Sequence, residues 1–287
     1  MKKLASILIP SLITINAILG QVSVATSEIE KRYIDGENLI FAEGKALDGV
    51  VYENYVRKKL EYNVKNGKKE GQYISYYENG RVKRRTVFKN DKHHGIFEEF
   101  FEDGQLSLKA SFKNGKYHGF FEIYYKKGNL EGKGYYKDGL YHGKIEKHYE
   151  NGKLKNKGFY KFGKKEGGFE TYYENGVLKR KSVYLNNYLE GFLYEYYDNG
   201  ILYVKSNYTK GKKDGEFNMY YPSGHIKSSW EFKEGFRHGS FEIFYENGLP
   251  LEKGIFKNGV RNGVFEKYNE NGELLAELKF KNGKRVE

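Results

Sequence analysis

Residues 71–287 alternate two short aromatic runs with two turns, and this pattern repeats every 24 residues in nine copies. Within each run, apolar and polar side chains alternate with a period of two, which predicts β-strands with two different faces. Glycine marks one turn of every copy, from Gly80 to Gly272, without a slip in the spacing. A fixed period of this length predicts a solenoid-like array of supersecondary units, not a globular domain.

The first turn of most copies is Asn-Gly or Asp-Gly between extended runs, a strong signal for a two-residue type I′ hairpin. With Asn175 and Gly176 as the loop residues, counting outward fixes the pairing of the two strands. The predicted partners are Tyr173 with Leu178, Glu170 with Lys181, and Phe169 with Ser182. The Glu and Lys positions recur in other copies as cross-strand charge pairs, which supports this register.

The second turn carries glycine in most copies, for example at Gly115, and Asp91 and Asn187 replace it in two. Asn and Asp tolerate positive φ best among the non-glycine residues, so the position requires a left-handed backbone. Two hairpin turns in each copy predict a continuous meander. Under the two registers, equivalent residues of successive copies are offset by two positions, so the ribbon should be coiled.

The predicted fold is therefore all-β, a single-layer antiparallel meander of β-hairpin repeats forming an elongated ribbon. Parity assigns the Phe169 column, the second tyrosine of each pair, the leucine column and the closing aromatic to one cohesive face. The opposite face carries the Glu and Lys columns and the first aromatic of each pair. We call these aromatics the first-tyrosine stripe, the candidate binding stripe: Tyr76, Phe100, Tyr124, Tyr172, Tyr196, Tyr220, Phe244 and Tyr268. The alternative is that these side chains stack on one another and shield a single-layer sheet. His148 occupies the same position in another copy.

Composition changes this picture in three respects. Aromatic residues make up 17% of the chain, which favours strands. The chain has no cysteine, so disulfides and thiolate metal sites are excluded and cohesion must come from stacking between repeats. The net charge of +12 favours anionic surfaces, although interleaved acids are equally typical of a solvated, salt-bridged surface.

The first 70 residues differ from the array. Residues 1–25 resemble an export signal, with Lys2 and Lys3 before an apolar run and small residues at Ser23 and Ala25 suited to cleavage. We expect an exported protein, in the periplasm, at the cell surface or secreted; the alternative is an uncleaved membrane anchor. Residues 26–70 carry blurred turn signals, as a degenerate N-terminal capping region would.

The motif Gly-x-Phe-Glu-x-Tyr-Tyr-x-Asn-Gly-x-Leu resembles the MORN repeat in its longer bacterial variant. It is present almost unchanged in residues 143–166, 167–190, 239–262 and 263–287. The resemblance covers about three-quarters of the chain. It implies β-hairpin repeats and partner binding, with no catalytic residue. Similar proteins are labelled YwqK-type toxin–antitoxin antitoxins, and other MORN proteins sit at membranes or serve as scaffolds.

Histidines share one repeat position at His94, His118, His142 and His238. Neighbouring copies lie two strands apart, roughly 9–10 Å, which is too far for two ligands of one ion, so we interpret them as polar turn residues. The recurrent glutamates each face a lysine and have no reason for a raised pKa. The sequence therefore predicts no catalytic, metal or cofactor site.

Two functions remain open. The first is a non-enzymatic, monomeric, exported scaffold that binds a protein partner, in an antitoxin-like or immunity-like role. The alternative is a cell-envelope module that binds polysaccharide or anionic lipid headgroups by stacking and charge. Nucleic acid is the least suitable ligand for an exported protein, and the enzyme class ranks third.

Overall fold

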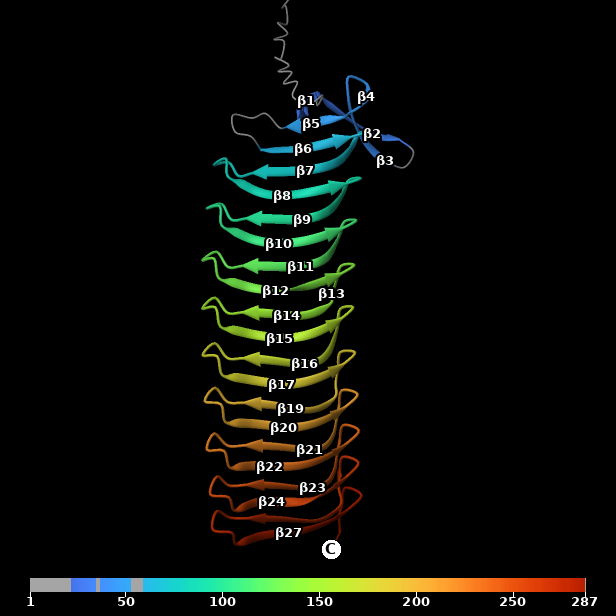
Figure 1. Cartoon of the computed structure of the whole chain (residues 1–287). Helices are drawn as coiled ribbons and strands as arrows, with labels where there is room; N and C mark the ends of the chain where they lie inside the picture. The colour runs from blue at the N-terminus through green and yellow to red at the C-terminus, as the bar shows by residue number, and fades with distance from the viewer. Residues whose placement is uncertain (1–21, 35–36, 53–58, 287) are drawn as a thin grey trace, which may run out of the picture. The chain divides into compact units, whose positions relative to one another are not determined.

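The computed structural model describes residues 22–34, 37–52 and 59–286 (Figure 1). It contains two compact units, Met1–Gly128 and Asn129–Glu287, and each is described by itself. Most of the expected export signal lies outside the described residues; its last four residues form a strand. Within the described residues, no helix is long and apolar enough to cross a membrane.

The N-terminal unit is a meander of antiparallel strands with a small sheet at its start. Its elements are β1 (Val22–Ala25), a 3₁₀ turn η1 (Thr26–Glu28), β2 (Ile29–Ile34), β3 (Glu37–Ala42), β4 (Lys45–Ala46), β5 (Gly49–Tyr52), β6 (Leu60–Lys65), β7 (Lys68–Tyr76), β8 (Val82–Lys89), β9 (Lys92–Phe100), β10 (Leu106–Lys113) and β11 (Lys116–Tyr124). Each strand from β5 to β11 pairs with the next in antiparallel fashion, whereas β1 pairs with β5 in parallel.

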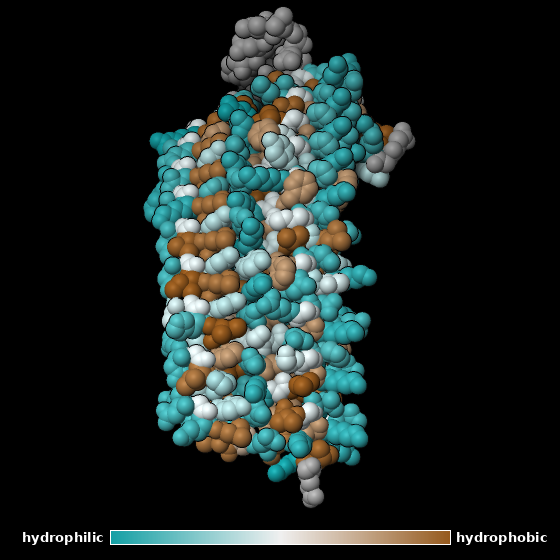
Figure 2. Space-filling model, turned by 60° about the horizontal axis from the view of Figure 1, so that its bottom comes forward, coloured by the Kyte–Doolittle hydropathy of each residue, from teal (hydrophilic) through white to brown (hydrophobic). Residues whose placement is uncertain are grey.

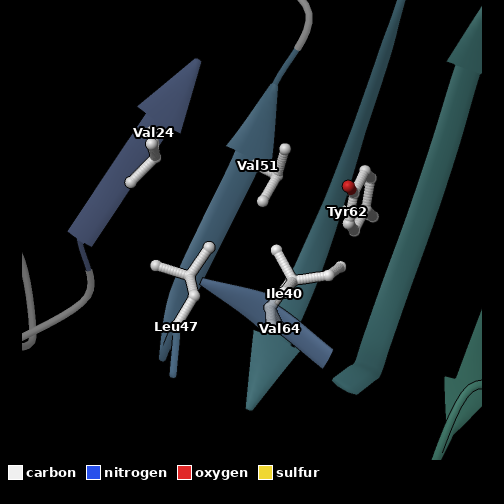
Figure 3. Packing of buried hydrophobic residues seen from close by; sticks show 6 residues of the cluster. All are labelled: Val24, Ile40, Leu47, Val51, Tyr62 and Val64. Atoms are coloured by element: carbon white, nitrogen blue, oxygen red, sulfur yellow. The ribbon is translucent and has the colours of Figure 1, made fainter. Parts of the chain in front are cut away.

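Strands β2, β3 and β4 form a separate three-stranded sheet that lies at the turn at Gly67, between β6 and β7. The amide of Ile40 donates to the carbonyl of Gly67 at 2.7 Å, so β3 lies where a preceding repeat would place its own turn. Beside this contact a cluster of buried side chains joins β1, β3, β5 and β6 (Figure 3). The cluster consists of Val24, Ile40, Leu47, Val51, Tyr62 and Val64. Buried aliphatic packing closes the exposed end of the meander in the N-terminal unit.

The C-terminal unit is antiparallel throughout. Its strands are β12 (Leu130–Lys137), β13 (Leu140–Tyr141), β14 (Gly143–His148), β15 (Leu154–Lys161), β16 (Lys164–Tyr172), β17 (Leu178–Leu185), β18 (Tyr188–Leu189), β19 (Gly191–Tyr196), β20 (Leu202–Thr209), β21 (Lys212–Tyr220), β22 (Ile226–Lys233), β23 (Phe236–Phe244), β24 (Pro250–Lys257), β25 (Val260–Arg261), β26 (Gly263–Tyr268), β27 (Leu274–Lys281) and β28 (Lys284–Val286). The predicted fold class, a single-layer antiparallel meander of hairpins, is confirmed in each unit.

The first turn differs from the predicted two-residue hairpin. Gly176 has φ of 95°, but Asn175 does not have positive φ, and the amide of Gly176 donates to the carbonyl of Tyr173 at 2.9 Å. This is a turn closed by a bulge glycine, so one extra residue enters the loop. Glu170 does lie opposite Lys181 and Phe169 opposite Ser182, as predicted.

The extra residue moves the leucine column. Leu178 lies opposite Tyr172 instead of Tyr173, so the prediction that leucines share the cohesive face is wrong. The leucines lie beside the first-tyrosine stripe. The phenylalanines of the Phe169 column pack on the cohesive face, and Phe97, Phe241 and Phe265 are buried there at 3–7% exposure. Aromatic packing on that face therefore supplies the main apolar burial of each repeat.

The structure confirms the prediction made from Asp91 and Asn187, the two residues that replace glycine at the second turn. Asn114 and Gly115 both have positive φ, as a type I′ turn requires, and Asp91 and Asn187 stand at φ of 60° and 74° in the glycine position. Each then uses its carboxylate or amide oxygen to accept the amide of Lys69 or Lys165. These two residues therefore adopt the left-handed backbone that the sequence predicted.

Equivalent residues of successive repeats lie directly across the strands from one another, with no offset along the strand direction. Gly158 lies opposite Ile145 on one side and Phe169 on the other, which are 24 positions apart. The predicted offset of two positions is therefore wrong. A second bulge at the glycine within each first strand, here Gly167 at φ of 74°, removes the offset.

Because equivalent residues are in line, hydrogen bonds recur from repeat to repeat. The hydroxyl of Tyr173 donates to the carbonyl of Tyr196 at 2.8 Å, and the side-chain amide of Asn175 donates to the carbonyl of Asp198 at 3.0 Å. The same tyrosine bond, always 23 residues apart, is made by Tyr77, Tyr149, Tyr197, Tyr221 and Tyr245. The second tyrosine of each pair thus holds its repeat to the next, in agreement with its predicted cohesive role.

Candidate functional site

The first-tyrosine stripe lies at the first-turn ends of the strands, and each ring is half-buried against the leucine column. Tyr172, for example, lies opposite Leu178, and Tyr196 lies opposite Leu202. All eight predicted residues are half-buried: Tyr76, Phe100, Tyr124, Tyr172, Tyr196, Tyr220, Phe244 and Tyr268. Part of each ring of the stripe therefore remains exposed to solvent, while the rest packs within the sheet.

Four hydroxyls of the stripe, on Tyr76, Tyr124, Tyr172 and Tyr268, donate to neighbouring carboxylates. Tyr172 donates to Glu170 two residues earlier on the same strand, and Tyr268 donates to Glu266 in the same way. Tyr76 donates to Glu61 on the adjacent strand at 2.6 Å. Burial and this bond raise the pKa of Tyr76 to about 12. The Tyr76 hydroxyl therefore stays protonated and acts as a donor.

Lysines complete the arrangement. Lys157 forms an ion pair with Glu170 at 2.7 Å and lies over the Tyr172 ring at 5.8 Å. Lys253 contacts Glu266 and Tyr268 in the same pattern. The hydrogen bond from Lys157 lowers the pKa of Glu170 below its ordinary value, as expected for a paired carboxylate. These ion pairs lie at the surface, and exposed ion pairs of this kind contribute only about 0.2–1 kcal/mol each.

A second set of aromatic and aliphatic residues lies on the same face and was missed by the sequence analysis. We call it the outer apolar row: Tyr135, Phe159, Val183 and Phe192, which are 57%, 45%, 43% and 43% exposed. Three of them follow a Glu-facing lysine by two positions, so the parity that located the stripe could have located them. Phe159 lies opposite Lys144 and Val183 opposite Gly168, so their neighbours leave the side chains open to solvent. The row is more exposed than the stripe and belongs to the C-terminal unit.

Apolar and polar residues form regular rows across the strands on the surface in Figure 2. Surface rows of this kind result from the repeat, since each column places the same residue type on every second strand. Single exposed apolar residues need no explanation, whereas a contiguous row marks an interaction surface.

The histidine column has a structural role at the second turns. The Nδ1 atoms of His142 and His238 lie 3.4 Å from the turn amides of Phe162 and Asn258, twenty residues further along. Glu70, Glu166 and Glu190 accept equivalent turn amides with a carboxylate oxygen. The column supplies an acceptor to the next repeat, which explains why glutamate, histidine and asparagine alternate there. Within the described ranges, no group of three His, Asp or Glu residues is placed to hold a metal ion.

A hollow of about 450 Å³ lies in the C-terminal unit, and Tyr172 and Tyr196 of the first-tyrosine stripe are among its lining residues. Tyr149, Tyr173 and Tyr203 line it together with Lys155 and Lys179. Lys155 lies 5.3 Å above the Tyr149 ring and Lys179 5.0 Å above the Tyr173 ring. Aromatic rings alternating with cations suit a ligand that stacks and carries negative charge.

A comparison with known protein families identifies the type of these repeats. A family model described as MORN repeat variant matches seven segments that together cover just over half of the chain: residues 69–90, 94–114, 141–162, 165–186, 213–234, 237–258 and 261–282. The matched segments fall on the hairpins of both units. A search of curated proteins finds no match to the chain.

Proposed function

Since the chain belongs to the MORN repeat variant family, we propose that it is a scaffold that binds a protein partner through the face bearing the first-tyrosine stripe and the outer apolar row. Repeats of this family commonly bind partners or membranes. The proposal assigns binding to surface side chains and assigns no catalytic residue, cofactor or metal. The protein acts as a monomer that presents one repeated surface.

The exposure of the outer apolar row is the observation that carries the proposal. Tyr135 and Phe159 present aromatic rings that are 57% and 45% exposed. They lie on β12 and β15, the second strands of two successive repeats. Aromatic side chains are enriched at the centres of protein interfaces, where their burial supplies much of the binding energy. The half-buried stripe lies on the same face beyond the Glu and Lys columns, and four of its tyrosines are already fixed by hydrogen bonds, which lowers the entropic cost of binding.

In its finer form the proposal is an exported, antitoxin-like or immunity-like protein. Lys2 and Lys3 before an apolar run support export, and the likeness to YwqK-type antitoxins supports a toxin as the partner. A toxin gene beside the gene for this chain would support the antitoxin-like role. A mature chain that retains residues 1–25 in the membrane fraction would replace export by membrane anchoring.

The test compares three tagged full-length chains in pull-downs from the native cell envelope, followed by mass spectrometry. The double variant Tyr135→Ser/Phe159→Ser should lose a protein that the wild type retains, because it removes the exposed rings. Leu140→Ser is the matched control, since Leu140 is 49% exposed but lies at the second turn. If all three chains retain the same proteins, this face does not bind the partner.

A second candidate is an envelope module that binds polysaccharide or anionic lipid headgroups. The hollow lined by Tyr149, Tyr173 and Lys155 favours it, together with the net charge of +12. Sedimentation with purified cell walls or acidic vesicles should then decrease with added salt and decrease in Lys155→Met/Lys179→Met. Unchanged sedimentation in that double variant would exclude this hollow as the site.

A further inference from the structure

A recess of about 700 Å³ opens in the N-terminal unit between the small sheet and the meander. Its walls come from β2 and β3 on one side and from the starts of β7 and β9 on the other. The volume is typical of small-molecule sites, which enclose roughly 300–1,000 Å³. The recess forms where β3 replaces a preceding repeat over the turn at Gly67, so it has no counterpart generated by the repeat pattern itself.

The charged side chains of the recess do not balance. Four lysines line it, Lys31, Lys68, Lys69 and Lys92, against two acids, Glu37 and Asp91. Lys68 forms an ion pair with Glu37. Asp91 accepts the backbone amide of Lys69 at 2.8 Å through one carboxylate oxygen. The lining therefore has an excess of two positive charges, and Lys31, Lys69 and Lys92 form no ion pair with a described residue.

Lys69 belongs to the lining of the recess, and its ammonium is held among three aromatic rings beside it. Its ammonium lies 5.3 Å from the Tyr62 ring, 5.7 Å from Tyr73 and 5.2 Å from Phe88. Burial lowers the pKa of Lys69, and the nearby charge of Lys31 lowers it further, while Asp91 opposes both. A partly desolvated ammonium beside another cation gains more from a bound anion than a lysine in open solvent does.

We propose that this recess binds a small phosphate-bearing anion, contacted by the ammonium groups of Lys31, Lys69 and Lys92. A phosphate monoester carries about −1.5 to −2 charges at neutral pH, which matches the excess of the lining. Lysine binds phosphate as a point charge, without the planar geometry that arginine needs for a carboxylate. The side-chain amide of Asn38, also in the lining, supplies an uncharged donor.

The test is isothermal titration of the full chain with inorganic pyrophosphate, at about 0.15 M salt so that diffuse surface attraction is screened. The wild type should bind saturably at one site. Lys31→Met/Lys92→Met should lower the affinity at least about tenfold, or about 1.4 kcal/mol. Lys116→Met is the matched control, because Lys116 occupies the place of Lys92 one repeat later and lies outside the recess.

A second arm identifies the source of the phosphate. Vesicles of phosphatidic acid in phosphatidylcholine are sedimented with the same three chains. Vesicle binding without pyrophosphate binding, lost in the double variant but kept in Lys116→Met, assigns the phosphate to a lipid headgroup. Equal losses in the double variant and the control, or no saturable binding of either probe, overturn the proposal. Thermal melts of all three chains verify that the fold is unchanged.

Discussion

Lys210→Asn should stabilise the protein, because Lys210 is the first residue of a second turn and holds φ of 50°. A left-handed backbone costs an L-residue other than glycine roughly 1–2 kcal/mol, and asparagine bears less of this cost. The Lys210 side chain is exposed, and the structural hydrogen bond at this position comes from its backbone amide to Glu190 at 2.9 Å. Replacing the side chain therefore removes strain without removing a contact. We expect a gain of about 0.5–1 kcal/mol.

Urea unfolding followed by far-UV circular dichroism measures this gain. With a slope of about 2 kcal/mol per molar urea, the midpoint should rise by roughly 0.2–0.5 M. Thr209→Asn is the control, because Thr209 is the preceding, exposed residue, has no positive φ and ends β20. Asparagine is unfavourable in a strand, so the control should lower the midpoint. If Lys210→Asn lowers the midpoint as much as Thr209→Asn does, backbone strain does not govern these turns.

Three further predictions concern single residues. Tyr173→Phe should lower the free energy of unfolding by about 0.5–1.5 kcal/mol in urea melts, since it removes the hydroxyl that bonds the next repeat. Gly158→Ala should cost about 1–3 kcal/mol, because the new Cβ would stand 2.2 Å from the Phe169 ring, whereas Gly168→Ala meets no atom within 4 Å and should be tolerated in the same melts. Burial and neighbouring cations lower the pKa of His93 in the folded protein, so the unfolded chain takes up the proton first. The free energy of unfolding should therefore fall as the pH drops through the ordinary histidine range, about 7 to 5. His93→Tyr should remove this decline in melts across that range.

The sequence was sufficient for the strands, the second turns and the cross-strand pairs because these depend on local chemistry. Asp91 and Asn187 indicated the left-handed backbone of the second turns. The charge pair of Glu170 and Lys181 indicated the register of the two strands of a repeat. The leucine column could not be placed correctly, because Leu178 lies between two irregularities, the bulge glycine Gly176 and the register shift at Thr171 and Tyr172 that restores the predicted pairing beyond it. Asn-Gly is compatible with both a two-residue turn and a bulged turn, and only the pairing of the complete strands distinguishes them.

The candidate site was predictable only in part. The first-tyrosine stripe follows from parity, but its half-burial follows from the leucines opposite, which the predicted register had placed on the other face. Tyr135 and Phe159 recur too irregularly among the copies to attract notice as a column. The lysine-lined recess could not be predicted at all, since Lys31 and Lys92 are distant in sequence and line one recess only because β3 lies at the turn at Gly67, between β6 and β7.

The constant separation of the bonds between repeats limits how the gene can change. Six second tyrosines donate to a carbonyl 23 residues later, and four first-turn asparagines, Asn79, Asn151, Asn175 and Asn247, do the same. Recombination that duplicates or removes a whole 24-residue unit recreates every one of these links at the new junction. Insertion or loss of a single codon breaks them there and also moves every following side chain of that strand to the other face. The coding sequence can therefore lengthen or shorten readily in steps of 72 nucleotides, since three nucleotides encode each of the 24 residues.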